Sequence, residues 1–349
     1  MKKNKLIETN EVTPEIKKSL RARIITAVIM LSVLVPCVFV GSLAYAIVGV
    51  FLAVAVGFEI VHASKPSKRF RIPIYILTIF LILSYVFWIF LKNNLTDLFN
   101  NQHTFDSIWT IFNTNFNDIY ISIIALIVSA LFYFMFSFLD DDTTISNVMY
   151  YIAMAAICGV SIQALMYLRY APFSAFSAEG SIYKDTVDVN SPIFQYLQSP
   201  LLLVYVLLGV IFNDTGAYFV GILFGKHRVN PRISPKKTWE GFAGGIVFSF
   251  ILSAGFALIL AACNFPIFPY LDLSHFYYIL IISAFVPIVA DLGDFVFSAI
   301  KRHFGIKDFS NILPGHGGVL DRFDSIFFCS VTVACFLVMV SGGWKFGIV

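Results

Sequence analysis

Long apolar stretches separated by short polar segments run through this chain of 349 residues. From Ile24 to Val61 the chain is apolar for 38 residues, with Glu59 as the single charged interruption. As one helix this stretch would be about 57 Å long, whereas the hydrocarbon core of a bilayer is only about 30 Å thick. We therefore expect two helices here, joined by a hinge near Gly41 and Ser42.

Seven further apolar runs come close to the roughly 20 residues that a membrane-spanning helix needs. They cover approximately residues 72–91, 119–139, 148–168, 200–224, 241–263, 276–297 and 326–341. The pattern therefore predicts an all-α integral membrane protein, a polytopic helical bundle with about nine transmembrane helices.

The composition supports a membrane protein and argues against several other classes. Hydrophobic residues make up 58% of the chain, charged residues 13%, and the mean hydropathy is +0.83. A soluble domain has about 25% charged residues. The formal net charge of +3 is too small to indicate a nucleic-acid partner. The five cysteines lie in apolar runs without a CxxC pair, which argues against a disulfide framework or a zinc site.

The lysines and arginines predict an orientation, because they gather on the cytoplasmic side of membrane proteins. With a cytoplasmic N-terminus, the inside segments 1–23, 62–71, 225–240 and 298–325 hold 20 of the 24 basic residues. We expect a multi-pass protein of the cell membrane, with the bacterial cytoplasmic membrane favoured, and an active site on the cytoplasmic face. The expected parts are a basic N-terminal segment (1–23), about five N-terminal transmembrane helices (24–197) and a C-terminal catalytic transmembrane domain (198–349). The outside loops 93–117 and 169–197 carry no motif.

Four acidic residues stand near the ends of two predicted helices. On a continuing helix Asp291 and Asp294 share one polar stripe with Ser298 and Lys301, and Asp321 and Asp324 are also spaced i, i+3. Carboxylates with no cysteine or paired histidine nearby favour Mg²⁺, held together with substrate phosphates. The alternative for each acid is a salt bridge to Lys301, Arg302 or Arg322.

Between these helices a glycine turn runs from Pro314 to Gly318. Such a turn can expose backbone N–H groups at the start of a helix, where they favour phosphate. We therefore expect Gly317 and Gly318 to contact a substrate phosphate.

The other polar segment begins with Asn213 and Asp214, in the middle of an apolar run, and continues from Ser234 to Gly241. Lys236 and Lys237 can serve as point charges for phosphate. Structural alternatives are anchoring on the cytoplasmic side for the lysines, an N-cap for Thr238 and close helix packing at Gly241 and Gly245. Taken alone, this segment favours the structural alternatives. Glu59 is equally consistent with a residue that reaches the membrane interface and with a functional buried acid.

The stretch from Ser298 to Asp324 resembles the signature of the phosphatidate cytidylyltransferase family. Twelve positions carry the resemblance: Ser298, Lys301, Arg302, Lys307, Asp308, Pro314, His316, Gly317, Gly318, Asp321, Arg322 and Asp324. The SPKKTWEG stretch that begins at Ser234 is also similar to this family. The strong part of the resemblance covers residues 205–330.

The resemblance implies a transferase that forms CDP-diacylglycerol and pyrophosphate from phosphatidate and CTP, working at a lipid bilayer and with a homodimer allowed. It implies Mg²⁺ bound by Asp294, Asp321 and Asp324, with room for a second cation. The implied catalytic residues are Lys301, Arg302, Lys307, Asp308, His316 and Arg322. The implied substrate-binding residues are Ser234, Lys236, Lys237, Thr238, Glu240, Ser298, Gly317, Gly318 and Asp214.

Two other functional classes stay open from the sequence. One is a different lipid-phosphate transferase, either a CTP-dependent enzyme that acts on an ether lipid or a polyprenol kinase. The other is a membrane transporter, since acids inside a membrane also mark ion paths. The predicted position of the acids at one membrane face, and the lack of an evident inverted repeat, argue against a transporter.

Overall fold

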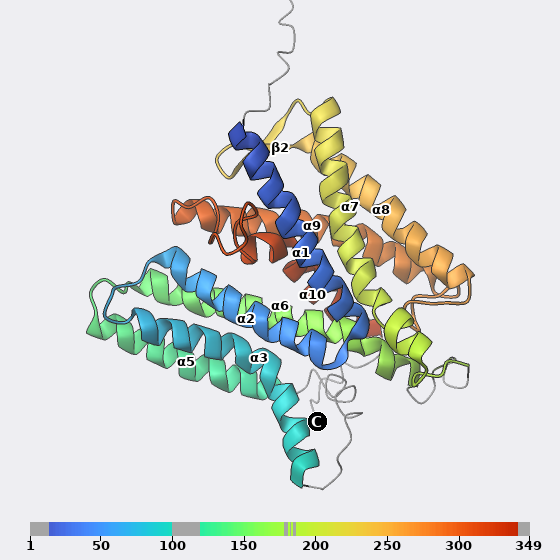
Figure 1. Ribbon diagram of the computed structural model, residues 1–349, viewed down its shortest axis with the longest axis horizontal. Helices are drawn as coiled ribbons and strands as arrows, with labels where there is room; N and C mark the ends of the chain where they lie inside the picture. Colours follow the sequence, from blue (N-terminus) through green and yellow to red (C-terminus); the bar gives the residue numbers. More distant parts are fainter. Residues whose placement is uncertain (1–13, 100–118, 178–180, 182, 184–185, 341–349) are drawn as a thin grey trace, which may run out of the picture.

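The computed structural model describes residues 14–99, 119–177, 181, 183 and 186–340. These residues form nine α-helices, one short π-helix and one two-stranded sheet (Figure 1). The helices are α1 (Pro14–Val40), α2 (Ser42–Ser64), α3 (Arg71–Phe99), α5 (Ile119–Leu139), α6 (Ile145–Ser177), α7 (Leu201–Phe224), α8 (Trp239–Ala262), α9 (Phe276–His303) and α10 (Leu320–Val340), with the π-helix η2 at Phe194–Gln198. The strands are β1 (Arg228–Asn230) and β2 (Ser234–Thr238).

The predicted hinge in the first long apolar stretch is confirmed. Helix α1 ends at Val40, α2 begins at Ser42, and Gly41 between them has φ 64° and ψ −140°. A residue with a side chain rarely adopts such a positive φ, whereas glycine does so without a steric penalty. Gly41 therefore lets the chain leave one helix and enter the next without a loop.

Several helices extend beyond the apolar runs that predicted them. Helix α3 continues to Phe99, α6 continues to Ser177, and α10 begins at Leu320 instead of near residue 326. The reason is that hydropathy marks the part of a helix that fits the bilayer core, whereas the helix itself ends where its backbone is capped. The expected loops 93–117 and 169–197 are therefore partly helical; residues 100–118 and the N-terminal residues 1–13 lie outside the described part.

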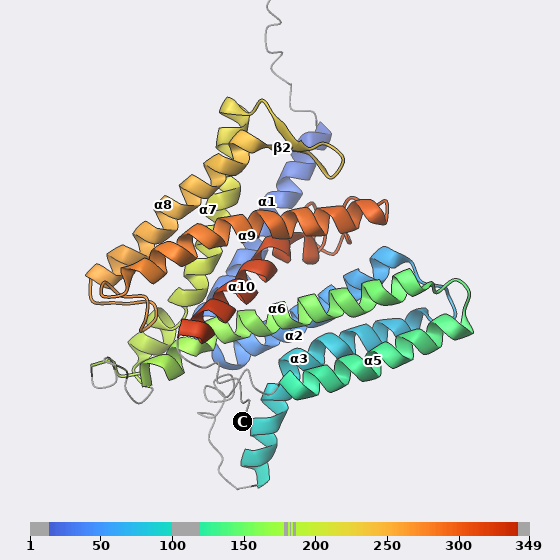
Figure 2. The ribbon, with the colours of Figure 1, turned by 180° about the vertical axis from the view of Figure 1, so that it is seen from behind.

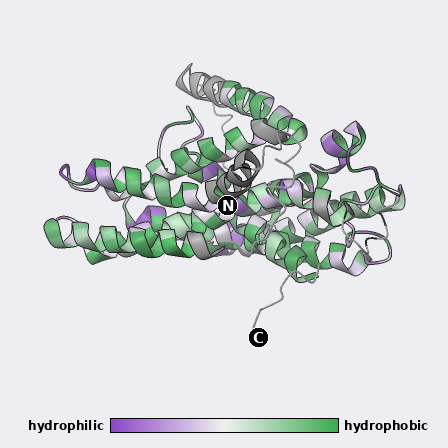
Figure 3. Cartoon of the chain, turned by 90° about the horizontal axis from the view of Figure 1, so that it is seen from below, coloured by the Kyte–Doolittle hydropathy of each residue, from purple (hydrophilic) through white to green (hydrophobic). Residues whose placement is uncertain are grey.

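The fold class is confirmed as an all-α membrane protein. Among the described residues six helical segments are long and apolar enough to cross a bilayer. They are Ala44–Ser64, Ile145–Phe173, Phe194–Phe224, Trp239–Ala262, Phe276–His303 and Leu320–Val340. The three other predicted spans contain shorter described apolar segments, Ile24–Val40, Arg71–Val86 and Ile123–Leu139. Hydrophobic residues, drawn in green, predominate along the helices (Figure 3), and many large ones are exposed, as lipid contact requires.

The helices pack in two groups. Helices α2, α3, α5 and α6 lie together in one group, and α7, α8, α9 and α10 form the other (Figures 1 and 2). Helix α10 packs against both α9 and α6, so that it joins the groups. The predicted domain boundary at residue 198 stays a prediction.

Two short polar segments connect helices of the second group. The first is an antiparallel hairpin of β1 and β2, which pairs Arg228 with Thr238 and Asn230 with Ser234. The second is the segment 304–319 between α9 and α10, which we call the signature loop. Both lie close to the same end of α9, because Arg302 in the last turn of α9 donates a hydrogen bond to the carbonyl oxygen of Ile233 in the hairpin.

Candidate active site

Lys237 connects the hairpin to helix α9 through two ion pairs. Its ammonium lies 2.7 Å from a carboxylate oxygen of Asp291 and 2.8 Å from one of Asp294. Burial by itself lowers the pKa of Lys237, but the carboxylates of Asp294 and Asp291 outweigh burial and raise the pKa above its ordinary value. The ammonium is therefore charged at neutral pH, and it neutralises part of a strongly acidic cluster.

Asn213 on α7 completes the surroundings of Asp291. Its side-chain amide donates to the second carboxylate oxygen of Asp291 at 3.1 Å, and both side chains are buried. The side-chain oxygen of Asn213 has no hydrogen-bond partner. The twelve signature positions do not include Asp291 or Asn213; the sequence indicates them through the polar stripe on α9 and the polar pair Asn213 and Asp214 on α7.

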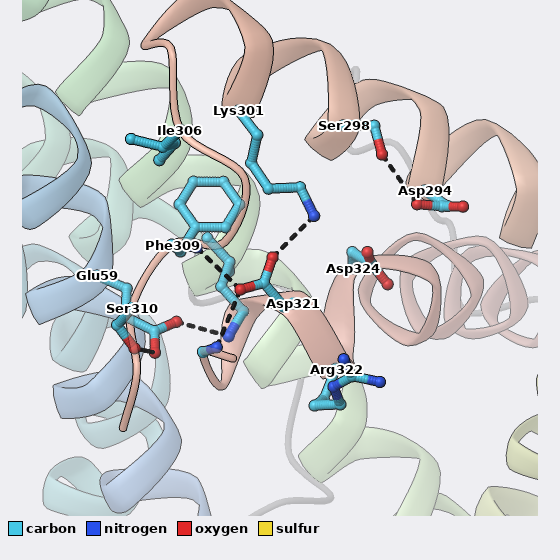
Figure 4. A network of polar contacts seen from close by, with 12 residues as sticks. Glu59, Asp294, Ser298, Lys301, Ile306, Phe309, Ser310, Asp321, Arg322 and Asp324 are labelled. Atoms are coloured by element: carbon cyan, nitrogen blue, oxygen red, sulfur yellow. Dashed lines mark hydrogen bonds and ion pairs between the residues drawn. The ribbon is translucent and has the colours of Figure 1, made fainter. Parts of the chain in front are cut away.

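Asp294 and Asp324 face each other across the contact between α9 and α10 (Figure 4). The two carboxylates interact electrostatically, and Ser298 donates a hydrogen bond to Asp294 at 3.1 Å. The close approach of the helices depends on Gly293, because a Cβ there would lie 3.0 Å from the carbonyl oxygen of Asp324. Asp214 on α7 is exposed, and its carboxylate interacts electrostatically with Lys237 and Asp294 of the same cluster.

Asp321 lies in the first turn of α10 and is held by three donors. The ammonium of Lys301 donates to one carboxylate oxygen at 2.7 Å, and the backbone N–H groups of Phe309 and Gly318 both donate to the other at 2.9 Å. Lys301 and Asp321 are buried. Of the two interpretations that the sequence allows for this acid, the salt bridge to Lys301 is the one formed in the structure (Figure 4).

Glu59 reaches the signature loop from the other helix group. Its side chain is fully buried and accepts hydrogen bonds from the hydroxyl of Ser310 at 2.6 Å and from the backbone N–H groups of Val319 and Leu320 at 2.7 and 2.6 Å. Glu59 is therefore enclosed by the protein and held against the signature loop.

The two glycines expected to bind phosphate have their backbone N–H groups engaged within the protein. The N–H of Gly317 donates to the carbonyl oxygen of Leu313, and that of Gly318 donates to Asp321. Gly317 has φ +89°, which favours glycine, and a Cβ on Gly318 would lie 2.6 Å from the carboxylate of Glu59. In this arrangement one N–H group binds a carbonyl oxygen of the protein and the other a carboxylate, and the expected phosphate contact stays a prediction.

The remaining charged residues of the signature either donate hydrogen bonds to backbone carbonyl oxygens of the loop or are exposed. Arg322 donates twice to the carbonyl oxygen of His316, and the Nδ1 atom of His316 is buried without a hydrogen-bond partner. Arg302 donates to the carbonyl oxygen of Ile306 as well as to the hairpin. Lys307 and Asp308 are exposed.

The hairpin residues divide into structural and exposed ones. Thr238 is the N-cap of α8 and accepts a hydrogen bond from the N–H of Gly241, as the structural alternative predicts. Glu240 accepts hydrogen bonds from the N–H groups of Lys226 and His227 and so closes the hairpin. Lys236 is exposed, and Ser234 is half-buried at the start of β2.

The donor set fits magnesium in its chemistry but only partly in its arrangement. Mg²⁺ commonly binds one or two carboxylates and takes its other ligands from water and substrate phosphates. Asp294 and Asp324 supply two adjacent carboxylates, whereas Asp321 is engaged by Lys301. Within the described residues no group of three or more such side chains forms a metal site.

Comparison with known proteins agrees with the motifs. A family model described as the cytidylyltransferase family matches residues 21–340. A phosphatidate cytidylyltransferase of Bacillus subtilis is 52% identical over 116 residues, which are 33% of this chain and 39% of that protein. Phosphatidate cytidylyltransferases of Staphylococcus haemolyticus and Staphylococcus saprophyticus are 44% and 42% identical, over 36% and 40% of this chain and 45% and 49% of theirs. The matched part therefore spans less than half the length of each relative.

Proposed function

We propose that this chain, which belongs to the cytidylyltransferase family, transfers the cytidylyl group of CTP to phosphatidate and releases pyrophosphate. One observation carries the proposal. Charged residues of α9 and α10, among them Asp294, Lys301 and Asp321, gather with Lys237 of the hairpin within an otherwise apolar helical bundle. Ion pairs are costly to bury in a membrane, so such a cluster indicates function.

The reaction we propose is a displacement at the α-phosphorus of CTP. A phosphate oxygen of phosphatidate forms a bond to this phosphorus, and the bond from the phosphorus to the oxygen of the β-phosphate breaks. The electron pair leaves with pyrophosphate. The attacking oxygen is already ionised at neutral pH, since the second pKa of a phosphate monoester is about 6. The task of the protein is therefore to bring two polyanions together and to stabilise charge on the leaving group.

Lys237 and Lys301 are suited to that task because each already carries a paired carboxylate. Both ammonium groups lie in a partly desolvated place, and an incoming phosphate can share or replace the carboxylate partner. The exposed Lys236 and Lys307 add positive charge at the entrance. His316, with a buried unpaired Nδ1, is our candidate for a hydrogen bond to a substrate or for proton transfer.

We also propose that the reaction depends on Mg²⁺. Asp294 and Asp324 would hold the ion, and Asp321 would join them when a substrate phosphate draws Lys301 away. When bound, the ion would neutralise charge on the phosphates of the substrate and of the leaving group. A second cation and a homodimer stay predictions from the sequence.

The lipid substrate would reach this site from the bilayer. Its acyl chains would remain among the exposed apolar side chains of the helices while its headgroup approaches the cluster. CTP would arrive from the cytoplasm, the side to which the basic residues assign the hairpin and the signature loop.

The experiment that tests the proposal follows the label of CTP. Purified protein is given phosphatidate or a polyprenol together with CTP labelled at either the α- or the γ-phosphorus. We expect the α-label alone to enter the lipid, only with phosphatidate and only with Mg²⁺ present. Transfer of the γ-label to the alcohol would identify a kinase, and an absence of any transfer to phosphatidate would contradict the proposed function.

A further inference from the structure

The contact of Glu59 with the signature loop joins two parts of the chain that are far apart in sequence. Glu59 lies on α2, and its hydrogen-bond donors Ser310, Val319 and Leu320 follow it by 251, 260 and 261 residues. Its side chain is 0% exposed. A carboxylate removed from water costs several kcal/mol unless its oxygens are satisfied, so this placement requires the donors that the loop provides.

The donors belong to the start of α10. The first N–H groups of a helix have no partner within it and carry partial positive charge, so a carboxylate is stabilised there. Glu59 takes the N–H groups of Val319 and Leu320, and Asp321 takes the N–H of the preceding Gly318. Consecutive N–H groups are thus divided between a carboxylate from α2 and a residue predicted to bind Mg²⁺.

The same division occurs earlier in the loop. Phe309 donates its N–H to Asp321, while the hydroxyl of the next residue, Ser310, donates to Glu59. The middle of the loop and its C-terminal end are therefore tied to the same two carboxylates (Figure 4). Because the two sets of bonds are one residue apart, a shift of the Glu59 contacts displaces the backbone that holds Asp321.

We infer that Glu59 is a positioning residue of the active site: it fixes the signature loop and the first turn of α10, and thereby the placement of Asp321 and its partner Lys301. This inference rests on the proposed function for its catalytic consequence. Glu59 acts through other residues, since it is buried and its contacts are to the loop. Gly318 is required by the same packing, because a side chain there would collide with the Glu59 carboxylate.

The test compares Glu59→Gln and Glu59→Asp with Ser310→Ala and Thr78→Val. Glu59→Gln keeps the size of the side chain but replaces one accepting oxygen with an amide N–H group. This group would face the N–H and O–H donors that now bind the carboxylate. Glu59→Asp keeps the charge and can restore part of the contact, and Ser310→Ala removes one of the three bonds. Thr78→Val is the matched stability control, because Thr78 is also fully buried and makes hydrogen bonds to Ile74 and Tyr133, away from the loop.

Two measurements are made on the purified proteins. Amide hydrogen exchange reports directly on the loop, and we expect faster exchange of residues 309–322 in Glu59→Gln but not in Thr78→Val. Steady-state kinetics should show kcat lowered by about 10- to 100-fold in Glu59→Gln, as for other residues that orient catalytic groups. The KM values should change little, and Glu59→Asp and Ser310→Ala should lose less.

The inference is overturned if exchange in residues 309–322 is unchanged in Glu59→Gln and Ser310→Ala. It is also overturned if Glu59→Gln and Thr78→Val have equal thermal stability and Glu59→Gln loses no more activity than Thr78→Val. If Glu59→Gln does not fold, Ser310→Ala and Glu59→Asp decide by the same two measurements. Should the unmodified protein show no cytidylyl transfer, the proposed function fails, and the exchange data alone still decide whether Glu59 positions the loop.

Discussion

At the scale of single residues, the candidate site is a set of charges that compensate one another. Lys237 offsets Asp291 and Asp294, and Lys301 offsets Asp321. Removing one member of a buried pair costs more than the pair contributes, because it leaves the other charge in a place where water cannot reach it. Substitutions that remove one partner should therefore affect both stability and activity. The relative size of the two effects distinguishes a structural role from a role in the reaction.

Lys237→Gln tests the first pair. It leaves Asp291, whose side chain is only 2% exposed, without its cation, and we expect the free energy of unfolding to fall by about 3 kcal/mol. The rate of cytidylyl transfer should fall by about 100-fold, as when one preorganised donor is lost from an active site. Reversible unfolding in mixed micelles measures the first effect. Lys236→Gln is the control for stability, since the side chain of Lys236 is exposed and should contribute little.

The two acids of α10 should behave differently. Asp321→Asn breaks the ion pair with Lys301 and weakens two backbone hydrogen bonds, so it should lower the free energy of unfolding by about 3 kcal/mol as well as the activity. Asp324→Asn removes a negative charge beside Asp294 and should leave stability unchanged or higher while it abolishes Mg²⁺-dependent turnover. Thermal unfolding beside an activity assay separates these outcomes. An Asp321→Asn protein as stable as the unmodified chain would show that Asp321 does not anchor the loop.

The sequence predicts which polar residues gather, but not how they pair. The twelve signature positions identify Lys301, Asp321 and Asp324, and the spacing along a helix places Asp291 and Asp294 on one stripe with Lys301. The bond from Lys237 to both acids crosses from a hairpin to a helix, and that from Glu59 crosses from α2 to α10. Such contacts depend on how helices pack, which neither hydropathy nor a local motif encodes.

At the scale of elements, the site depends on the close packing of α7 against α8. A Cβ at Gly245 would lie 2.7 Å from the side-chain oxygen of Asn213 and 2.8 Å from its carbonyl oxygen. A Cβ at Gly241 would lie 2.8 Å from the carbonyl oxygen of Ala217. The small residues thus allow backbone contact between helices, and they bring Asn213 to Asp291.

A pair of identical substitutions on α8 tests this packing. Gly245→Ala places a methyl group against the backbone of Asn213 and should destabilise the protein by about 1–3 kcal/mol. Gly255→Ala is the control, because a Cβ there meets nothing within 4 Å, and its helical preference should stabilise the protein by up to about 1 kcal/mol. Both free energies of unfolding can be measured in the same micelles. Equal effects of the two substitutions would contradict a packing role for Gly245.

The elements themselves were largely predictable, and their ends were not. The break at Gly41 follows from a helix too long for a bilayer, and Thr238 caps α8 as its residue type suggests. The start of α10 at Leu320 was missed because Asp321 and Asp324 lower the hydropathy of its first turns. That turn is helical because carboxylates, including Glu59 from another helix, satisfy its N–H groups.

At the scale of the whole molecule, the N-terminal helices supply part of the site formed by the C-terminal ones. Besides Glu59, Thr26 on α1 donates a hydrogen bond to the carbonyl oxygen of Pro314 in the signature loop. The region of strong family resemblance, residues 205–330, therefore folds against segments in which the resemblance is only general. We expect residues 198–349 expressed alone to lack activity, because the loop would lose its contacts to α1 and α2; labelled CTP and phosphatidate measure this, and full activity of the fragment would exclude the contribution of both helices.

The orientation of the bundle is the last property that the charge pattern predicts, and α8 offers a direct test of it. With 24 residues and a rise of about 1.5 Å per residue, α8 is long enough to cross a bilayer, so its two ends should lie on opposite sides. Cys263, which is exposed, follows its C-terminal end, and Arg232, also exposed, lies in the hairpin near its N-terminal end. A maleimide that cannot cross membranes should label Cys263 in intact cells when the other cysteines are replaced. In a cysteine-free chain, Arg232→Cys should react only after the cells are made permeable. The reverse pattern would invert the predicted topology and place the basic segments outside, and labelling of both sites from one side would show that α8 does not span the membrane.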